Sequence, residues 1–96
     1  MKTGNFWYLY MLLCDQKTFY VGMTSDPRAR IKQHRNKQNI STKEFSDLKL
    51  VYCERYPNKF DTAKREKQIK GWSHVKKQML VDEKLGINIC AEFVEV

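Results

Sequence analysis

The sequence predicts a small α+β fold: a three-stranded antiparallel sheet flanked by helices, in the order ββαβαα. Two segments rich in aromatic and apolar residues, 6–13 and 18–23, lie on either side of a four-residue polar turn, which is typical of paired strands. A third segment with alternating apolar residues covers 48–54. Helical patterns follow the second and third strands, at 27–37, 60–70 and 74–84. The length of 96 residues predicts a single domain spanning residues 1–96.

The first strand has tyrosines on one face and apolar residues on the other. Because side chains alternate along a strand, Tyr8 and Tyr10 point to one face, and Leu9 and Met11 point to the other. The turn that follows, 14–17, contains no glycine. The second strand is a run with aromatic residues that fits a pleated surface. We therefore expect a hairpin with phenol groups on one of its faces.

The second strand leads directly into the first helix. Gly22, near the end of this strand, allows the backbone to bend or another group to approach closely. Asp26 and Pro27 are typical of a helix start, with aspartate as the N-cap and proline at the first helical position. Arg30 and His34 are four residues apart, so they lie on one face of this helix.

A polar stretch, 36–47, separates this helix from the third strand and has neither a helical nor a strand period. We expect a surface loop, in which Lys37, Lys43 and the pair 41–42 either contact phosphate or are simply solvated. In the third strand the alternation places Leu48, Leu50 and Tyr52 on one face and Val51 and Cys53 on the other.

The second helix is expected to begin with Asp61 as its N-cap and to end at Lys70, before a glycine. Glu66 lies three residues from each of the two apolar positions of this helix, at the edge of the buried face. From the residues alone, the favoured interpretation of Glu66 is an ion pair with Arg65, with Lys70 or with an arginine across the interface, because charge on a helix is usually solvated.

The third helix is expected to begin after Ser73 as its N-cap. Trp72, Val75 and Met79 recur at helical spacing, and we interpret this stripe as core. Residues 87–96 are apolar and β-branched, so an extra strand or a docked tail is expected there.

Charge favours a polyanionic partner. The chain has 18 Lys and Arg against 11 Asp and Glu, a net charge of +7. This balance points to nucleic acid, most simply DNA, although charge alone leaves a merely basic surface equally open. Three widely spaced cysteines suggest reduced thiols in a cytoplasmic protein. No apolar run could cross a bilayer and no signal peptide is present, so neither a membrane nor an obligate protein partner is expected.

Taken in order, several of these residues resemble a known catalytic core. The triplet 8–10 (YLY), the triplet 20–22 (YVG), and then Arg30 and His34 are similar to the GIY-YIG nuclease superfamily. The small single-domain bacterial-type members also have a phrase like 63–72 (AKREKQIKGW), which is present here in full. Two positions depart from the motif: Tyr8 replaces its first glycine and Val21 its isoleucine. We take Tyr10 as the family tyrosine, with Tyr8 on the same face.

The resemblance implies a metal-dependent endonuclease that hydrolyses DNA phosphodiester bonds. In such enzymes one carboxylate holds a single Mg²⁺ (or Mn²⁺), and the resemblance assigns that role to Glu66. It implies that Arg30 binds the scissile phosphate and that Tyr10 acts as base or positions the water. Tyr20 would support Tyr10, and His34 would lower its pKa or take up its proton. An arginine suits phosphate because its guanidinium is planar and permanently charged.

Further phosphate contacts are expected from basic residues of the first two helical regions: Arg28, Lys32, Arg35, Lys37, Lys64, Lys67 and Lys70. Such contacts supply affinity but read no sequence. We therefore expect structure-directed or weakly specific cleavage, in DNA repair or recombination. The alternative is a nucleic-acid-binding module that keeps the scaffold without cutting.

Overall fold

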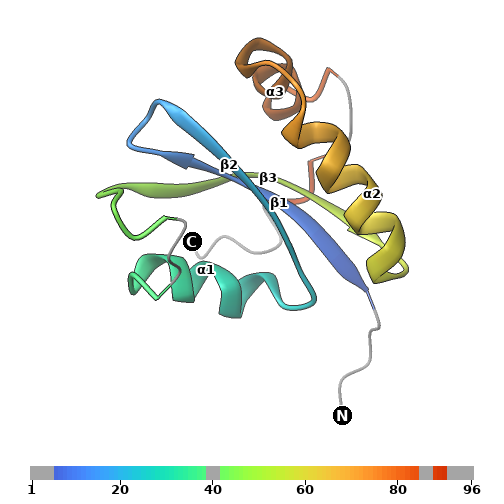
Figure 1. Ribbon diagram of the computed structural model, residues 1–96, viewed down its shortest axis with the longest axis horizontal. Coiled ribbons are helices and arrows are strands. Elements are labelled where there is room, and N and C mark those ends of the chain that lie inside the picture. Colours follow the sequence, from blue (N-terminus) through green and yellow to red (C-terminus); the bar gives the residue numbers. More distant parts are fainter. Residues whose placement is uncertain (1–5, 39–41, 85–87, 91–96) are drawn as a thin grey trace.

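A computed structural model describes residues 6–38, 42–84 and 88–90 of the chain. It confirms the predicted fold and element order (Figure 1). The strands are β1 (Trp7–Cys14), β2 (Thr18–Thr24) and β3 (Leu48–Tyr56), and the helices are α1 (Pro27–Arg35), α2 (Lys59–Lys70) and α3 (His74–Val81). No helix in the described ranges is both long and apolar enough to span a membrane. All three cysteines are free.

The sheet is antiparallel throughout, with strand order β2-β1-β3. The central strand, β1, is therefore paired on both edges. Among the described residues no strand pairs with the outer edge of β2, whereas the outer edge of β3 is contacted by Asn88 and Ile89, which bond to Val51 and Cys53. Tyr10 is paired with Gly22 of β2 and with Cys53 of β3. This register places Tyr10, the expected family tyrosine, beside Gly22, the glycine of the second triplet.

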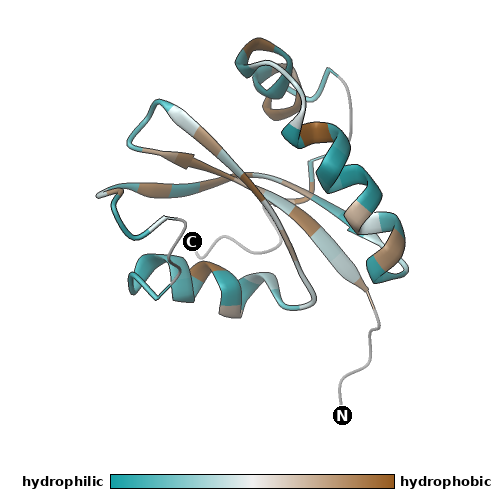
Figure 2. Cartoon of the chain, viewed as in Figure 1, coloured by the Kyte–Doolittle hydropathy of each residue, from teal (hydrophilic) through white to brown (hydrophobic). Residues whose placement is uncertain are grey.

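The two faces of the sheet belong to two separate cores. The expected alternation of β1 is confirmed: Leu9 and Met11 pack with residues of α2 and α3, while Tyr10 and Leu12 pack with Ile31 of α1. Figure 1 shows α1 on one side of the sheet and α2 with α3 on the other. In Figure 2 the hydrophobic residues lie mostly along the strands, and the helices are largely hydrophilic. The sheet therefore supplies most of the apolar surface of both cores.

The turn between β1 and β2 is held in a left-handed conformation without glycine. Asp15 and Gln16 have φ values of 50° and 60°. The Asp15 carboxylate accepts hydrogen bonds from the backbone N–H groups of Ser46 and Asp47, at 2.9 and 2.8 Å. These bonds hold the Asp15 side chain on a loop distant in sequence, and aspartate is among the few residues besides glycine that are enriched in this region. No comparable bond accounts for Gln16 among the contacts described.

Replacing Gln16 with glycine is expected to stabilise the protein by about 1 kcal/mol. Glycine adopts positive φ without the steric cost that other residues pay, and an Asp-Gly pair is favoured in turns of this kind. Urea denaturation would measure the change. Gln38→Gly, at an exposed glutamine outside the turn, is the control and should bring no gain; an equal gain in both variants would contradict the explanation.

A β-bulge in β3 corrects the expected alternation of that strand. The pairing with β1 shifts between Met11 and Leu12, so that Tyr52 and Leu50 oppose these neighbours and Val51 is extra. As a result Leu50 and Tyr52 lie in opposite cores, not on one face as predicted. The Asn88 side chain donates to the carbonyl of Val51 at 2.8 Å and so satisfies a backbone group of the bulge. Of the expected tail strand 87–96, only residues 88–90 lie in the described part, and they form no strand.

Two further details differ from the sequence predictions. The N-cap of α2 is Asn58, whose side chain accepts from the N–H of Asp61 at 2.8 Å. Asp61, the expected cap, lies inside the first turn instead. Val75 is 71% exposed and does not belong to the core, although Leu80 is fully buried and Ser73 caps α3 as expected.

Candidate active site

Tyr10 and His34 form a buried hydrogen-bonded pair. The Tyr10 hydroxyl and His34 Nε2 are 2.8 Å apart, and their rings meet edge to face with centroids 5.7 Å apart. Tyr10 is 1% exposed and His34 is fully buried. Tyr10 comes from the central strand and His34 from the last turn of α1, so the contact joins sheet and helix at this point.

The other ring nitrogen of His34 is held by a residue that the sequence did not single out for His34. Nδ1 of His34 lies 2.6 Å from the Oγ1 atom of Thr42, which is fully buried. The neighbouring Lys43 and Glu44 are exposed, as expected for a surface loop. One signal could have pointed to Thr42: a buried histidine needs partners for both ring nitrogens, and the following loop offers few hydroxyl groups.

Tyr20 and Arg30 complete the cluster from β2 and α1. The Tyr20 ring centroid lies 6.2 Å from that of Tyr10 and 5.3 Å from that of His34. Arg30, on the same face of α1 as His34, lies near enough for its charge to act on both Tyr10 and His34. Both Tyr20 and Arg30 are partly exposed, so they form the solvent side of the cluster. Four of the five expected catalytic residues are thus brought together.

The buried pair is neutral in the free protein. Burial and the neighbouring Tyr20 raise the pKa of Tyr10 well above its usual value, although Arg30 opposes this rise. Burial, and then the positive charge of Arg30, lowers the pKa of His34. Near neutral pH Tyr10 therefore keeps its proton, and His34 carries no charge.

Gly22 leaves the space that the Tyr10 ring occupies. A Cβ atom at Gly22 would lie 2.5 Å from the Tyr10 hydroxyl oxygen and 2.6 Å from its Cζ atom. Gly22 does not have a positive φ, so its role here is close approach and not an unusual backbone conformation. A glycine is needed at position 22 because the side chain of Tyr10 lies directly over it.

Glu66 lies on α2, the helix that covers the opposite face of the sheet. Its carboxylate is 3.5 Å from Lys70 Nζ, and 20% of its side chain is exposed, so the ion pair with Lys70 considered from sequence is present. Residues on a helix are roughly 100° apart, which places Glu66 and Arg65 on either side of the line facing the sheet. Because Arg65 reaches Glu54 of β3, Glu66 lies toward the β1–β2 side.

The carboxylate of Glu66 fits the single protein ligand that the resemblance implies. It is partly open to solvent, and its 3.5 Å ion pair is too long for a tight hydrogen bond. In the described ranges no group of three or more histidine, cysteine or acidic residues could hold a metal together. One carboxylate with water and phosphate oxygens suits Mg²⁺, which keeps much of its hydration shell.

The seven basic residues expected to contact phosphate are all exposed, but on two sides of the molecule. Four of them lie on or just after α1, which packs on one face of the sheet, and three lie on α2, which packs on the other. One of them has a structural use: Lys37 Nζ donates to the carbonyl of Phe45 and ties down the loop. Lys70 is paired with Glu66.

A buried carboxylate, that of Glu54, lies between β3 and α2, away from Tyr10 and Tyr20. The carboxylate of Glu54 accepts from Arg65 at 3.0 and 3.1 Å, from the Tyr56 hydroxyl at 2.6 Å, and from the Tyr52 hydroxyl. Burial raises the pKa of Glu54, but these hydrogen bonds outweigh it and leave that pKa below its usual range. Burial and the bond to Glu54 raise the pKa of Tyr56 to about 12.

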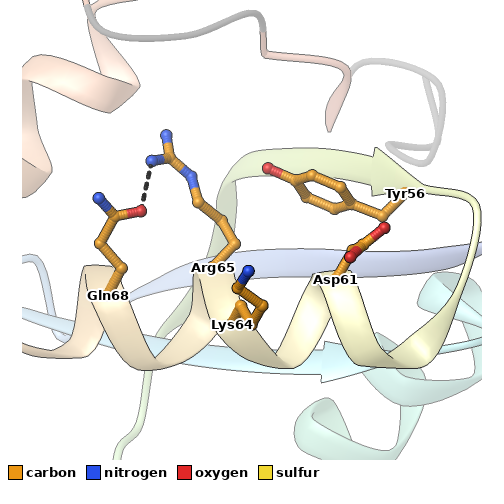
Figure 3. Close-up of a pocket in the computed structure, with 5 residues that line it drawn as sticks. All are labelled: Tyr56, Asp61, Lys64, Arg65 and Gln68. Atoms are coloured by element: carbon orange, nitrogen blue, oxygen red, sulfur yellow. Dashed lines mark hydrogen bonds between the residues drawn. The ribbon is translucent and has the colours of Figure 1, made fainter.

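A pocket opens beside this charge cluster. Figure 3 shows Tyr56 of β3 and four side chains of α2 around it, with Gln68 bonded to Arg65. The Arg65 guanidinium is already committed to Glu54 and also lies over the Trp72 ring, 5.1 Å from its centroid. Since Arg65 and Glu54 are paired with each other, we interpret this ion pair as a structural link between α2 and the sheet.

Known proteins resemble this chain in sequence and in fold. The GIY-YIG catalytic domain matches residues 6–78. A UPF0213 protein of the archaeon Natronomonas pharaonis is 32% identical over 80 residues, covering 82% of this chain and 94% of that protein. A UPF0213 protein of Staphylococcus aureus is 33% identical over 78 residues, covering 80% and 95%. The solution NMR structure of UPF0213 protein BH0048 from Bacillus halodurans matches with a TM-score of 0.54 and 31% identity, covering 82% and 85%.

Proposed function

Because the chain belongs to the GIY-YIG catalytic domain family, we propose that it is a metal-dependent endonuclease that hydrolyses DNA phosphodiester bonds. One observation supports this most: side chains of β1, β2 and α1 converge on a single cluster of two phenols, a guanidinium and an imidazole. A scaffold that only bound nucleic acid would have no need to bury a neutral imidazole against a phenol.

Arg30 binds the scissile phosphate in this proposal. It is partly exposed, and its planar fork can bond two phosphate oxygens at once. The phenol of Tyr20 lies on the same solvent side of the cluster and meets the attacking water. Tyr20 rather than Tyr10 has this place because only Tyr20 is appreciably exposed.

Tyr10 and His34 take up the proton that the water loses. As the proton of the water passes to Tyr20, the proton of Tyr20 passes to Tyr10, and that of Tyr10 passes to Nε2 of His34. Both tyrosines stay neutral, and only His34 becomes charged. This sequence avoids a free phenolate, which the raised pKa of Tyr10 disfavours. The negative phosphate beside Arg30 would stabilise the resulting imidazolium.

Glu66 would hold the Mg²⁺ or Mn²⁺ ion from the other side of the open β2 edge. Such an ion, when bound, polarises the phosphate and stabilises the leaving oxygen. The exposed basic residues of α1 and α2 would hold the DNA backbone across the same edge. Because contacts to phosphate read no sequence, we expect the substrate to be chosen by shape, as in repair or recombination.

The test is nicking of supercoiled plasmid and of a branched oligonucleotide, with Mg²⁺ or Mn²⁺ and with chelator. Glu66→Gln removes the charge at constant shape and is expected to lower nicking by about a hundredfold or more, since a metal supplies several kcal/mol of transition-state stabilisation. Binding of the same DNA should remain within a few-fold.

Glu44→Gln is the control, because Glu44 is an exposed glutamate of the loop. It should nick like the wild type. Equal nicking by wild type and Glu66→Gln would remove Glu66 from the site. Salt-sensitive binding without any metal-dependent nicking would instead favour the binding module that keeps this scaffold.

A further inference from the structure

Thr42 is a buried polar residue in the loop between α1 and β3. It is fully buried, while its described neighbours Lys43, Glu44, Ser46 and Asp47 are exposed. Its Oγ1 atom lies 2.6 Å from Nδ1 of His34, and the hydroxyl is its only side-chain polar group. A hydroxyl can either donate to or accept from a ring nitrogen, so the bond at the other nitrogen of His34 decides which of the two Thr42 does.

The partners of Tyr10 indicate the direction of each hydrogen bond. Between a neutral phenol and a neutral imidazole, the phenol is the stronger acid and the unprotonated ring nitrogen is the stronger base, so the favoured hydrogen bond runs from the Tyr10 hydroxyl to the ring. The partner in line is Nε2 of His34, at 2.8 Å. A neutral imidazole that accepts at Nε2 carries its hydrogen at Nδ1, and that hydrogen faces Thr42.

We propose that Thr42 is a positioning residue: it accepts the hydrogen bond from Nδ1 of His34 and thereby keeps Nε2 unprotonated toward Tyr10. This inference rests on the proposed function for its catalytic consequence, because Nε2 is the final proton acceptor there. Thr42 touches neither substrate nor water. It acts through the tautomer and the ring orientation of His34.

The rest of the structure holds Thr42 in place. The backbone carbonyl of Thr42 accepts from the N–H of Phe45 at 3.1 Å, and the carbonyl of Phe45 accepts from Lys37. The Asp15 carboxylate, in the β1–β2 turn, binds the N–H groups of Ser46 and Asp47. These bonds fix residues 45–47, which follow Thr42, and the Phe45–Thr42 bond links Thr42 to them.

The first readout needs no variant and no activity. Nitrogen-15 chemical shifts of the His34 ring distinguish hydrogen at Nδ1 from hydrogen at Nε2, and we expect the Nδ1–H form in the wild type. Thr42→Val keeps the shape without the hydroxyl and should move His34 toward the Nε2–H form. Nicking should then fall by about a hundredfold, the lower end of what a positioned acid or base supplies. Thr42→Ser should restore both.

Thr62→Val is the matched control. Thr62 is also fully buried, and its hydroxyl donates to the carbonyl of Asn58 at 2.8 Å, on the other side of the sheet. It should lose stability without changing the His34 tautomer. A wild-type His34 in the Nε2–H form, or a tautomer unchanged in Thr42→Val, would overturn the inference. A tautomer that shifts as expected in a protein that never nicks would leave the inference standing and overturn the nuclease proposal.

Discussion

Replacing Gly22 with alanine is expected to destabilise the protein by about 1–3 kcal/mol, as overpacking of a well-filled core does. The added methyl group would lie 2.5–2.9 Å from three atoms of the Tyr10 side chain, closer than real Cβ contacts. The Tyr10 ring cannot simply swing away, because it is 1% exposed and bonded to His34. Either the ring moves and the Tyr10–His34 bond breaks, or β1 and β2 separate. In both cases nicking should fall together with stability.

Urea denaturation and the nicking assay measure these two effects in the same preparation. Gly71→Ala is the matched control, because a Cβ atom there would lie 3.5 Å from its nearest neighbour, the carbonyl of Gln68. It should leave stability unchanged or raise it by a few tenths of a kcal/mol, since alanine reduces the entropy of the unfolded chain. If Gly22→Ala were as stable and active as Gly71→Ala, the close packing of Tyr10 over Gly22 would be contradicted.

Replacing Arg65 with methionine is expected to cost about 3 kcal/mol of folding free energy. Removing one partner of a buried ion pair leaves the other charge without compensation, which costs roughly 3–5 kcal/mol. We expect the lower end because 20% of the Arg65 side chain is exposed. The two tyrosine hydroxyls would remain on Glu54, so the carboxylate would lose its charged partner but not all its hydrogen bonds.

The pH dependence of stability tests the same pair. Since the folded pKa of Glu54 lies below its usual value of 4.5, the unfolded chain binds a proton first as the pH falls. Glu54 therefore contributes stability above pH 4.5 that is lost in more acidic solution. Arg65→Met should flatten this loss. Lys70→Met breaks the exposed Glu66–Lys70 pair and should cost less than about 1 kcal/mol; equal costs in the two variants would contradict the buried role of Arg65.

The sequence predicts the elements well because most of them depend on local chemistry. The alternation of β1 and the Asp26 and Ser73 caps need only the neighbouring residues, and all three are confirmed. Four site residues also meet as expected, because register and the helical period of α1 place them on one side of the sheet.

The remaining features depend on contacts distant in sequence. The residues of β3 alternate regularly in the sequence, and nothing in that pattern marks the bulge. Only the pairing with β1 shows that Leu50 and Tyr52 lie on opposite faces of the sheet. Thr42 lies in a loop without periodicity, so no sequence pattern marks it as buried. Its role becomes visible only through its contact with the buried ring of His34. Asn58 and Asp61 are both suitable caps three residues apart, and local sequence does not decide between them.

The bulge at Val51 reverses which face of the sheet the following residues of β3 point to. Without the extra residue, strict alternation from Leu50 would turn Tyr52 and Glu54 toward α1 and His34. With it, the buried carboxylate of β3 faces Arg65, while the tyrosine cluster meets no acidic side chain from that strand. One inserted residue thus segregates negative charge to the far side of the sheet and leaves the near side electrostatically suited to a polyanion.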